Sequence, residues 1–382
     1  MVSALKNKIP KKINKTRKVL FIVPNLRGGG AERVITTLLR HLNTKLFHLV
    51  IAVVDMKESV YREDIPDYVE VIDLKCNRVR YALPKIIALI IRRKPNIVFS
   101  TLGHLNVALA LIRPFLSNKI TYIARETIIV SYGILKYGNP KLWSILYRKI
   151  YSNFDCIVCQ SIGMQTDLIE NFGISETKTK VINNPVDVER VKKLASQDFE
   201  QQYSFNHKCT FVSVGRLVPQ KGFDILIKAI ALVKNPKIEV FLLGEGPLRE
   251  ELELLALSEG VSKQINFVGF QENPYQWIAK ADAFILSSRF EGFPNVVLEA
   301  LACGTPIIST PEPGGVKEIL TDIDRCIIAD AIDAESLSRA ILFWLEGQRK
   351  KISLDYVDKY SIKNILSQYE SLLLNNDSLT NS

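Results

Sequence analysis

Short apolar runs alternate along the chain with longer segments whose apolar residues recur with the period of a helix. In the first half we expect strands at 18–24, 48–55, 69–74, 96–101, 119–125 and 155–161, and helices at 29–42, 82–95 and 140–151. The strand runs are rich in Val and Ile and lack polar alternation, which is typical of parallel strands covered on both faces. The first half therefore predicts a parallel α/β sheet.

The same alternation starts again near residue 209. We expect strands at 209–215, 238–244, 265–270, 283–288, 306–310 and 326–330, and helices at 222–234, 295–304 and 360–374. The polar stretch between the halves contains Pro185 and has no strand pattern. The chain thus predicts two doubly wound, Rossmann-like α/β domains. Their expected bounds are a basic tail at 1–17, a first domain at 18–190, a linker at 191–207, a second domain at 208–355, and a final helix with a frayed tail at 356–382.

Composition agrees with a folded protein, since 47% of the 382 residues are hydrophobic and 24% are charged. The net charge of +10 is unevenly spread. Residues 1–190 carry 30 Lys and Arg against 15 Asp and Glu, whereas residues 191–382 carry 20 against 25. The excess of +15 in the first half indicates an anionic partner: membrane lipid, a phosphorylated substrate or nucleic acid.

The cysteines and the chain start bear on location. Cys156 and Cys159 form a C-x-x-C pair without a second Cys or His pair, so an ordinary buried strand is favoured over a zinc site. Nothing resembles a disulfide framework, which favours a reducing cytoplasm. The basic start lacks the apolar core of a secretory signal, and no apolar run reaches the roughly 18 residues of a membrane span.

Three loops at expected strand ends carry candidate chemistry. Gly28, Gly29 and Gly30 open the first helix, but Arg33 stands where the dinucleotide fingerprint needs its third glycine. In the second half, Arg216 and Lys221 lie between a strand and a helix, where two cations can bind a diphosphate. Glycines such as Gly244 follow the next strand on the same edge.

The third loop lies in "SRFEGFPNVVLEALACG" (288–304). Glu291 lies in the loop and Glu299 eight residues later, inside the helix that follows. A carboxylate among Val, Leu and Ala needs a partner, although an acidic residue near a helix start is also mildly stabilising. The N–H groups of Asn295, Val296 and Val297 are available for a phosphate. A ligand with a sugar, a diphosphate and a ribose in series fits this order.

The Glu-x7-Glu block, "GRLVPQKGFD" upstream and "GGGAERV" near the start together resemble retaining GT-B glycosyltransferases of group 4, over roughly residues 18–375. The resemblance implies two Rossmann-like domains facing a cleft and a nucleotide-sugar donor, most often a UDP-sugar. It implies that Arg216 and Lys221 grip the diphosphate, that Glu299 binds the ribose, that Glu291 contacts the transferred sugar, and that backbone near Phe270 meets the base. The donor-site residues are then Gly28, Gly29, Gly30, Arg216, Lys221, Gly244, Phe270, Glu291, Gly292, Phe293, Pro294, Asn295, Val296 and Glu299. His104 aligns with a histidine near the reacting centre, although this chain has a single His there. The catalytic candidates are thus Glu291, His104, Arg216 and Lys221.

The reaction implied is transfer of a hexose or N-acetylhexosamine, with retention, to a hydroxyl of a lipid-linked or polysaccharide acceptor in O-antigen, lipopolysaccharide or capsule assembly. No metal and no cofactor are expected, because two cations can hold the diphosphate. A sugar-nucleotide epimerase of the same fold remains an alternative. The failed fingerprint disfavours a dinucleotide oxidoreductase, and the lack of any known module pattern disfavours a nucleic-acid binder.

Basic residues beside apolar ones lead us to expect peripheral attachment to an anionic membrane at the inner face of the cell membrane. They occur at 6–18, at 82–94 and at 140–151. In the last segment, Trp143, Leu146, Tyr147, Ile150 and Tyr151 share roughly one side of the expected helix, with Lys141, Arg148 and Lys149 nearby. Such a helix can lie at headgroup depth. The alternative is that these helices pack on the sheet with their charges solvated.

Overall fold

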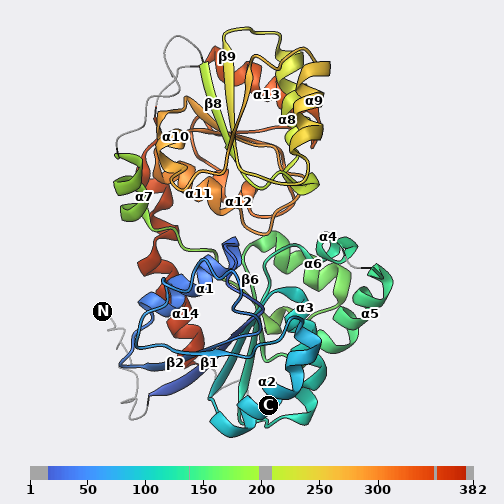
Figure 1. The fold of residues 1–382 in the computed structure, drawn as a ribbon, viewed down its shortest axis with the longest axis vertical. Helices are drawn as coiled ribbons and strands as arrows, with labels where there is room; N and C mark the ends of the chain where they lie inside the picture. Colours follow the sequence, from blue (N-terminus) through green and yellow to red (C-terminus); the bar gives the residue numbers. More distant parts are fainter. Residues whose placement is uncertain (1–15, 137, 198–208, 348–350, 376–382) are drawn as a thin grey trace, which may run out of the picture. The chain divides into compact units, whose positions relative to one another are not determined.

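The computed structural model of the chain describes residues 16–136, 138–197, 209–347 and 351–375. Two parallel sheets carry the fold (Figure 1). The first has the strand order β3-β2-β1-β4-β5-β6-β7 and the second β10-β9-β8-β11-β12-β13. The strands are β1 (Arg17–Val23), β2 (Phe47–Val53), β3 (Glu70–Asp73), β4 (Ile97–Thr101), β5 (Thr121–Arg125), β6 (Cys156–Cys159), β7 (Thr179–Val181), β8 (Cys209–Val214), β9 (Ile238–Leu243), β10 (Ile265–Gly269), β11 (Ala283–Leu286), β12 (Ile307–Ser309) and β13 (Ile327–Ile328).

Helices occupy the crossovers between these strands. The α-helices are α1 (Gly30–His41), α2 (Val79–Arg93), α3 (Gly103–Ile112), α4 (Val130–Gly133), α5 (Pro140–Ile150), α6 (Ile162–Phe172), α7 (Val188–Ala195), α8 (Phe223–Val233), α9 (Arg249–Ser258), α10 (Tyr275–Lys280), α11 (Asn295–Ala302), α12 (Val316–Leu320), α13 (Ala334–Glu346) and α14 (Ile362–Leu374). The 3-10 helices are η1 (Arg113–Phe115), η2 (Ile134–Lys136), η3 (Tyr151–Asn153), η4 (Glu176–Lys178), η5 (Pro219–Lys221) and η6 (Leu354–Tyr360).

The strands and helices expected from the sequence are confirmed, with ends that differ by a few residues. The short β7 was missed because three half-buried residues carry too little apolar signal. The basic tail at 1–15 and the linker residues 198–207 lie outside the described residues. The described start of the linker is helical, because Asp187 caps α7 by accepting the N–H of Arg190 at 3.0 Å.

The chain divides into two compact units, here called unit 1 and unit 2. Unit 1 comprises Met1–Arg125, Ile150–Ile157 and Tyr369–Ser382, and unit 2 comprises Glu126–Lys149 and Val158–Gln368. In unit 1, the ring of Tyr369 on the last helix packs against Phe99 of β4, with ring centroids 6.1 Å apart. The next strand residue, Ser100, donates to Asn106 of α3 at 2.7 Å. Since neighbouring strand residues point to opposite faces, α14 and α3 cover opposite faces of this sheet.

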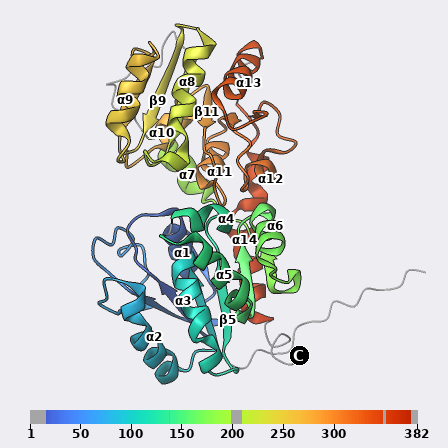
Figure 2. The same ribbon diagram turned by 90° about the vertical axis from the view of Figure 1, so that its right-hand side faces the viewer.

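In unit 2, two apolar layers enclose the second sheet. One layer packs α8, α9 and α13 against β8, β9 and β11. The other packs α7, α10, α11, α12 and η6 against the opposite face (Figure 2). Both faces are therefore dry, which explains why the strands are continuously apolar in sequence.

The charged segments expected at a membrane are partly packed into the protein. Tyr147 of α5 and Tyr151 are buried, so the prediction that these two rings face a membrane is wrong. They were assigned by helical period alone, and the same apolar stripe serves packing. Leu142 and Ile145 are exposed on α5 instead. None of the helices in the described ranges has the length and apolar composition of a membrane-spanning helix.

A substitution in the core of unit 2 should lower the stability of this unit. Leu226 of α8 is fully buried, so Leu226→Ala should lower the free energy of unfolding by about 3 kcal/mol through lost burial and a residual cavity. Trp143, Trp277 and Trp344 all lie in unit 2, so tryptophan fluorescence during urea unfolding reports on this unit. The exposed Leu254 of α9 gives the control L254A, which should shift the midpoint little. Equal shifts for both variants would contradict the described packing.

Candidate functional site

The carboxyl ends of the strands in unit 2 gather the sequence-predicted donor residues. The loops after β8, β11 and β12 span 215–222, 287–294 and 310–315. In the sheet, β8 is the neighbour of β11, and β11 is the neighbour of β12. All three loops therefore leave the same edge, which is where parallel α/β sheets bind ligands.

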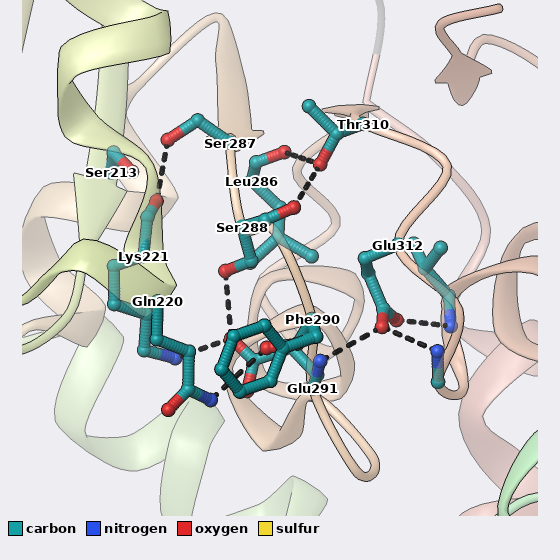
Figure 3. A network of polar contacts seen from close by, with 12 residues as sticks. Ser213, Gln220, Lys221, Leu286, Ser287, Ser288, Phe290, Glu291, Thr310 and Glu312 are labelled. Carbon is teal, nitrogen blue, oxygen red and sulfur yellow. Dashed lines mark hydrogen bonds and ion pairs between the residues drawn. The ribbon is translucent and has the colours of Figure 1, made fainter. Parts of the chain in front are cut away.

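An ion pair joins the first two loops. Lys221, the last residue of η5, places its Nζ 2.6 Å from Oε1 of Glu291. Ser288 donates its hydroxyl to the same oxygen at 2.7 Å (Figure 3). The side chain of Lys221 is 21% exposed and that of Glu291 is 10% exposed, so the pair is largely shielded yet reachable from solvent. Two donors on one oxygen hold the Glu291 carboxylate in a defined orientation.

In two further hydrogen bonds, a side chain from one of these loops donates to a main-chain carbonyl of the other. The hydroxyl of Ser287 donates to the carbonyl of Lys221 at 2.9 Å. The amide of Gln220 donates to the carbonyl of Phe290 at 3.0 Å. Gly222 has a φ of +61°, and a Cβ there would lie 2.1 Å from the carbonyl oxygen of Ser287. Only glycine permits this approach, because a side chain here would push the two loops apart.

Arg216 and the loops after β9 and β10 surround this pair. Arg216 is exposed, and its side chain makes no hydrogen bond or ion pair within the part of the chain that the structure describes, although its main-chain carbonyl accepts the N–H of Val218 at 2.8 Å. Gly244 has a φ of +138°, and a Cβ there would lie 2.0 Å from the carbonyl oxygen of Gly215, so these two loops pack backbone to backbone. Phe270 directly follows β10 and is 72% exposed. An uncommitted cation and an uncovered ring at this edge are suited to an anionic ligand with a flat group.

The start of α11 supplies main-chain donors beside Glu291. Gly292, Phe293 and Pro294 lead into the helix, and Asn295 and Val296 are its first two residues, whose N–H groups have no intrahelical acceptor. The N–H of Val297 donates to the carbonyl of Pro294 at 2.9 Å. The expectation that Val297 offers a third amide is therefore wrong, because a turn bond uses it. Glu299 is buried in the second turn of the same helix.

Two charged residues at this edge were missed by the sequence analysis. Glu312 is buried in the loop after β12, and its carboxylate accepts three main-chain N–H groups. Burial, and then the charge of Glu291, raise the pKa of Glu312 to about 7. Lys136 of η2 donates to the side-chain oxygen of Gln220 at 2.9 Å and lies 5.2 Å from the ring centre of Phe290. The signal for Glu312 was "PEPGG" at a strand end, whereas nothing near Lys136 in sequence marks it.

Unit 1 holds the remaining sequence-predicted residues. Gly28, with a φ of +99°, Gly29 and Gly30 connect β1 to α1. Glu32 folds back over Gly29, where a Cβ would lie 2.2 Å from its carboxylate, and burial raises the pKa of Glu32. The turn after β4 bears Leu102 at a φ of +76°, a strained conformation for leucine.

His104 follows this strained turn and lines a pocket of about 250 Å³. The pocket is formed by Pro24, Asn25, Arg27, Val54, Asp55, Asn77, Arg78, Val79 and His104. Burial lowers the pKa of His104, so the imidazole is neutral at pH 7. In the described residues His104 makes no hydrogen bond. A neutral imidazole with open nitrogens can accept or donate a proton to a bound hydroxyl.

Comparison with known proteins matches both halves of the chain to glycosyltransferase domain models. Residues 28–190 match the model "Glycosyltransferase Family 4", and residues 196–363 match "Glycosyl transferases group 1". An N-acetylgalactosamine-N,N'-diacetylbacillosaminyl-diphospho-undecaprenol 4-alpha-N-acetylgalactosaminyltransferase from Campylobacter jejuni is 29% identical over 346 residues, which are 87% of this chain and 91% of the relative. The lipopolysaccharide core biosynthesis glycosyltransferase LpsE from Rhizobium meliloti is 34% identical over 191 residues, 50% of this chain and 54% of the relative.

Solved structures show the same fold. Anabaena Alr3699/HepE, in complex with UDP and glucose, superposes with a TM-score of 0.74 at 20% identity, covering 94% of this chain and 99% of HepE. At this identity the likeness concerns the fold, which is two Rossmann-like domains of the GT-B type. The two domain matches make this chain a glycosyltransferase built from a family 4 domain followed by a group 1 domain.

Proposed function

We propose that the protein transfers a hexose or N-acetylhexosamine from a UDP-sugar, with retention and without a metal ion, to a hydroxyl of a lipid-linked or polysaccharide acceptor in cell-envelope glycan assembly. The observation that carries the proposal is the Lys221–Glu291 pair, which sets a cation and a carboxylate side by side at the ligand-binding edge of unit 2. The names of the Campylobacter and Rhizobium relatives and the UDP bound in HepE support it.

Each part of the donor has a matching group in unit 2. Arg216, Lys221 and the first amides of α11 bind the diphosphate, since cations and helix N-termini favour phosphate oxygens. Glu291 accepts hydrogen bonds from hydroxyls of the transferred sugar. Glu299 binds the ribose hydroxyls, and the chain near Phe270 meets the uracil.

The chemical step breaks the bond between the anomeric carbon and the diphosphate oxygen, and UDP leaves with the electron pair. Negative charge grows on that oxygen, where Arg216 and Lys221 stabilise it. Losing one such group typically costs about 3 kcal/mol, or about a hundredfold in rate. Two cations provide the charge stabilisation that a metal ion supplies elsewhere, so no metal is needed. The acceptor hydroxyl attacks the face that the UDP leaves and gives its proton to the departing diphosphate oxygen, so the new glycosidic bond keeps the original configuration.

Residues of unit 1 bind the acceptor in this proposal. His104 lies at the carboxyl end of β4, in the pocket that also contains Arg27 and Arg78. Arg27 already pairs with Asp55 at 2.7 Å. The neutral imidazole is suited to a hydroxyl of the acceptor sugar, and the arginines are suited to an anionic group beyond it.

Nucleotide binding gives the first test. UDP at about a hundred times its Kd should stabilise unit 2 by about 2.7 kcal/mol, measured as a rise in Tm, and GDP and ADP should raise it less. R216A should reduce the rise with UDP, because it removes a diphosphate contact, whereas R190A on the exposed face of α7 should not. A larger rise with GDP or ADP would refute the uridine assignment, and no rise with any nucleotide would refute the donor site.

The two carboxylates of the Glu-x7-Glu block should separate binding from transfer. E291Q should keep UDP affinity and lose most turnover, because it changes a sugar contact. E299A should weaken UDP binding about tenfold, because ribose hydrogen bonds are lost. Calorimetric UDP titration and release of UDP from UDP-N-acetylgalactosamine measure the two effects, and E250Q on the exposed surface of α9 is the control. Full activity in both variants would place the donor elsewhere, and a changed sugar without an acceptor would indicate an epimerase.

Attachment to an anionic membrane is the third part of the proposal. The +15 balance of residues 1–190 and the exposed Leu142 and Ile145 on α5 support it. Each Lys or Arg near an anionic leaflet contributes about 1 kcal/mol. We expect the protein to float with phosphatidylglycerol vesicles at low salt and to be released as salt rises. L142S/I145S should weaken flotation, whereas L254S/L257S, which alters still more exposed leucines on α9, should not. Failure to float at low salt would favour a soluble acceptor.

A further inference from the structure

Glu312 is a buried charged group to which the donor roles above assign no task. Its side chain is in the loop after β12, and the residue is 1% exposed. One carboxylate oxygen, Oε2, accepts the N–H of Glu291 at 3.0 Å and that of Gly314 at 2.6 Å. The other, Oε1, accepts the N–H of Val316 at 2.9 Å. Both oxygens are thus engaged by main-chain donors from two separate loops (Figure 3).

These bonds fix the segment that carries Glu291. A Cβ on Gly314 would lie 2.6 Å from the carbonyl oxygen of Glu291 and 2.8 Å from that of Gly292, so the two loops touch through their backbones. The hydroxyl of Thr310 donates at 2.6 Å to the carbonyl of Ser288, which lies three residues before Glu291. The loop after β12 therefore holds the Glu291 segment at two points, Ser288 and Glu291 itself.

A neutral residue cannot replace Glu312 in this arrangement. Glutamine has a single acceptor oxygen, and its NH2 group would face one of the amides. The position is nonetheless costly for a carboxylate, because burial and the nearby charge of Glu291 both oppose ionisation. A carboxyl group kept in such a place, with one oxygen bound to the main-chain N–H of the sugar-facing Glu291, points to a role in the reaction.

We propose that Glu312 is a positioning residue for sugar transfer. It holds the main chain of Glu291, while Lys221 and Ser288 hold the side chain, so that the carboxylate faces the donor sugar in one orientation. The inference rests on the proposed role of Glu291 and adds a residue that acts through it. Misplacing a contacting group by about 1 Å can cost about a hundredfold in rate, which sets the size of the expected effect.

The test measures UDP release from UDP-N-acetylgalactosamine by E312Q. The amide leaves at least one main-chain N–H without an acceptor, so the Glu291 segment should shift. We expect kcat to fall about a hundredfold, while the Kd for UDP stays within about twofold, because the two cations proposed to bind the diphosphate, Arg216 and Lys221, lie in the loop after β8. E312D sets the carboxylate back by one methylene, so its kcat should lie between those of E312Q and the wild type. E312D replaces E312Q in the test if E312Q does not fold. A wild-type kcat for either folded variant would overturn the proposal.

A matched control separates positioning from general stability. Asp282 also accepts a main-chain N–H, that of Thr210 at 2.8 Å, but at the amino ends of β8 and β11. D282N should lower the Tm as E312Q does and leave kcat unchanged. If D282N lowered kcat as much as E312Q, the effect would be one of stability and the proposal would fail.

A double-mutant cycle with E291Q tests the path of the effect. If Glu312 acts through Glu291, E291Q/E312Q should turn over no more slowly than E291Q alone. Additive losses would show that Glu312 acts independently, which overturns this inference and leaves the role of Glu291 intact. Full activity of E291Q alone would instead refute the proposed function of Glu291, and the inference with it.

Discussion

The ion pair between Lys221 and Glu291 is the contact on which the rest of the site depends. It joins residues 70 positions apart, and it forms because β8 and β11 are neighbours in the sheet. A shielded pair of this kind is stable only when its remaining polar atoms are satisfied, since removing either partner leaves a charge without compensation. Ser288 completes the carboxylate, Gly222 allows the loops to approach, and Glu312 holds the main chain from the other side.

Two carboxylates lie close together at this edge, and separate donors stabilise each of them. Glu291 and Glu312 repel each other, which contributes to the raised pKa of Glu312. Lys221 lies against Glu291, and three main-chain N–H groups surround Glu312, so each carboxylate has its own donors. Among the residues that the structure describes, the Arg216 side chain has no hydrogen-bond or ion-pair partner and remains exposed. This edge therefore keeps one exposed cation in addition to the Lys221–Glu291 pair.

Unit 1 uses a different physical device at its own strand ends. Leu102 is held at a positive φ immediately before α3, which begins with Gly103 and His104. Backbone strain of this kind costs on the order of 1–3 kcal/mol and persists only where the surroundings enforce it. His104 lies just after this strained turn on the wall of a pocket that also contains arginines, and burial lowers its pKa.

The sequence by itself determined the order of strands and helices, the loops in which the candidate residues lie, and the Glu-x7-Glu block, because periodicity and loop residues are local properties. It could not show that Glu312 binds the main chain of Glu291, that Lys136 meets Gln220, or that Tyr147 and Tyr151 turn inward. Those contacts join residues from 21 to 84 positions apart or choose one side of an amphipathic helix. Sheet order and packing decide them, since only the folded chain brings separate strand ends together and sets which apolar stripe faces the core.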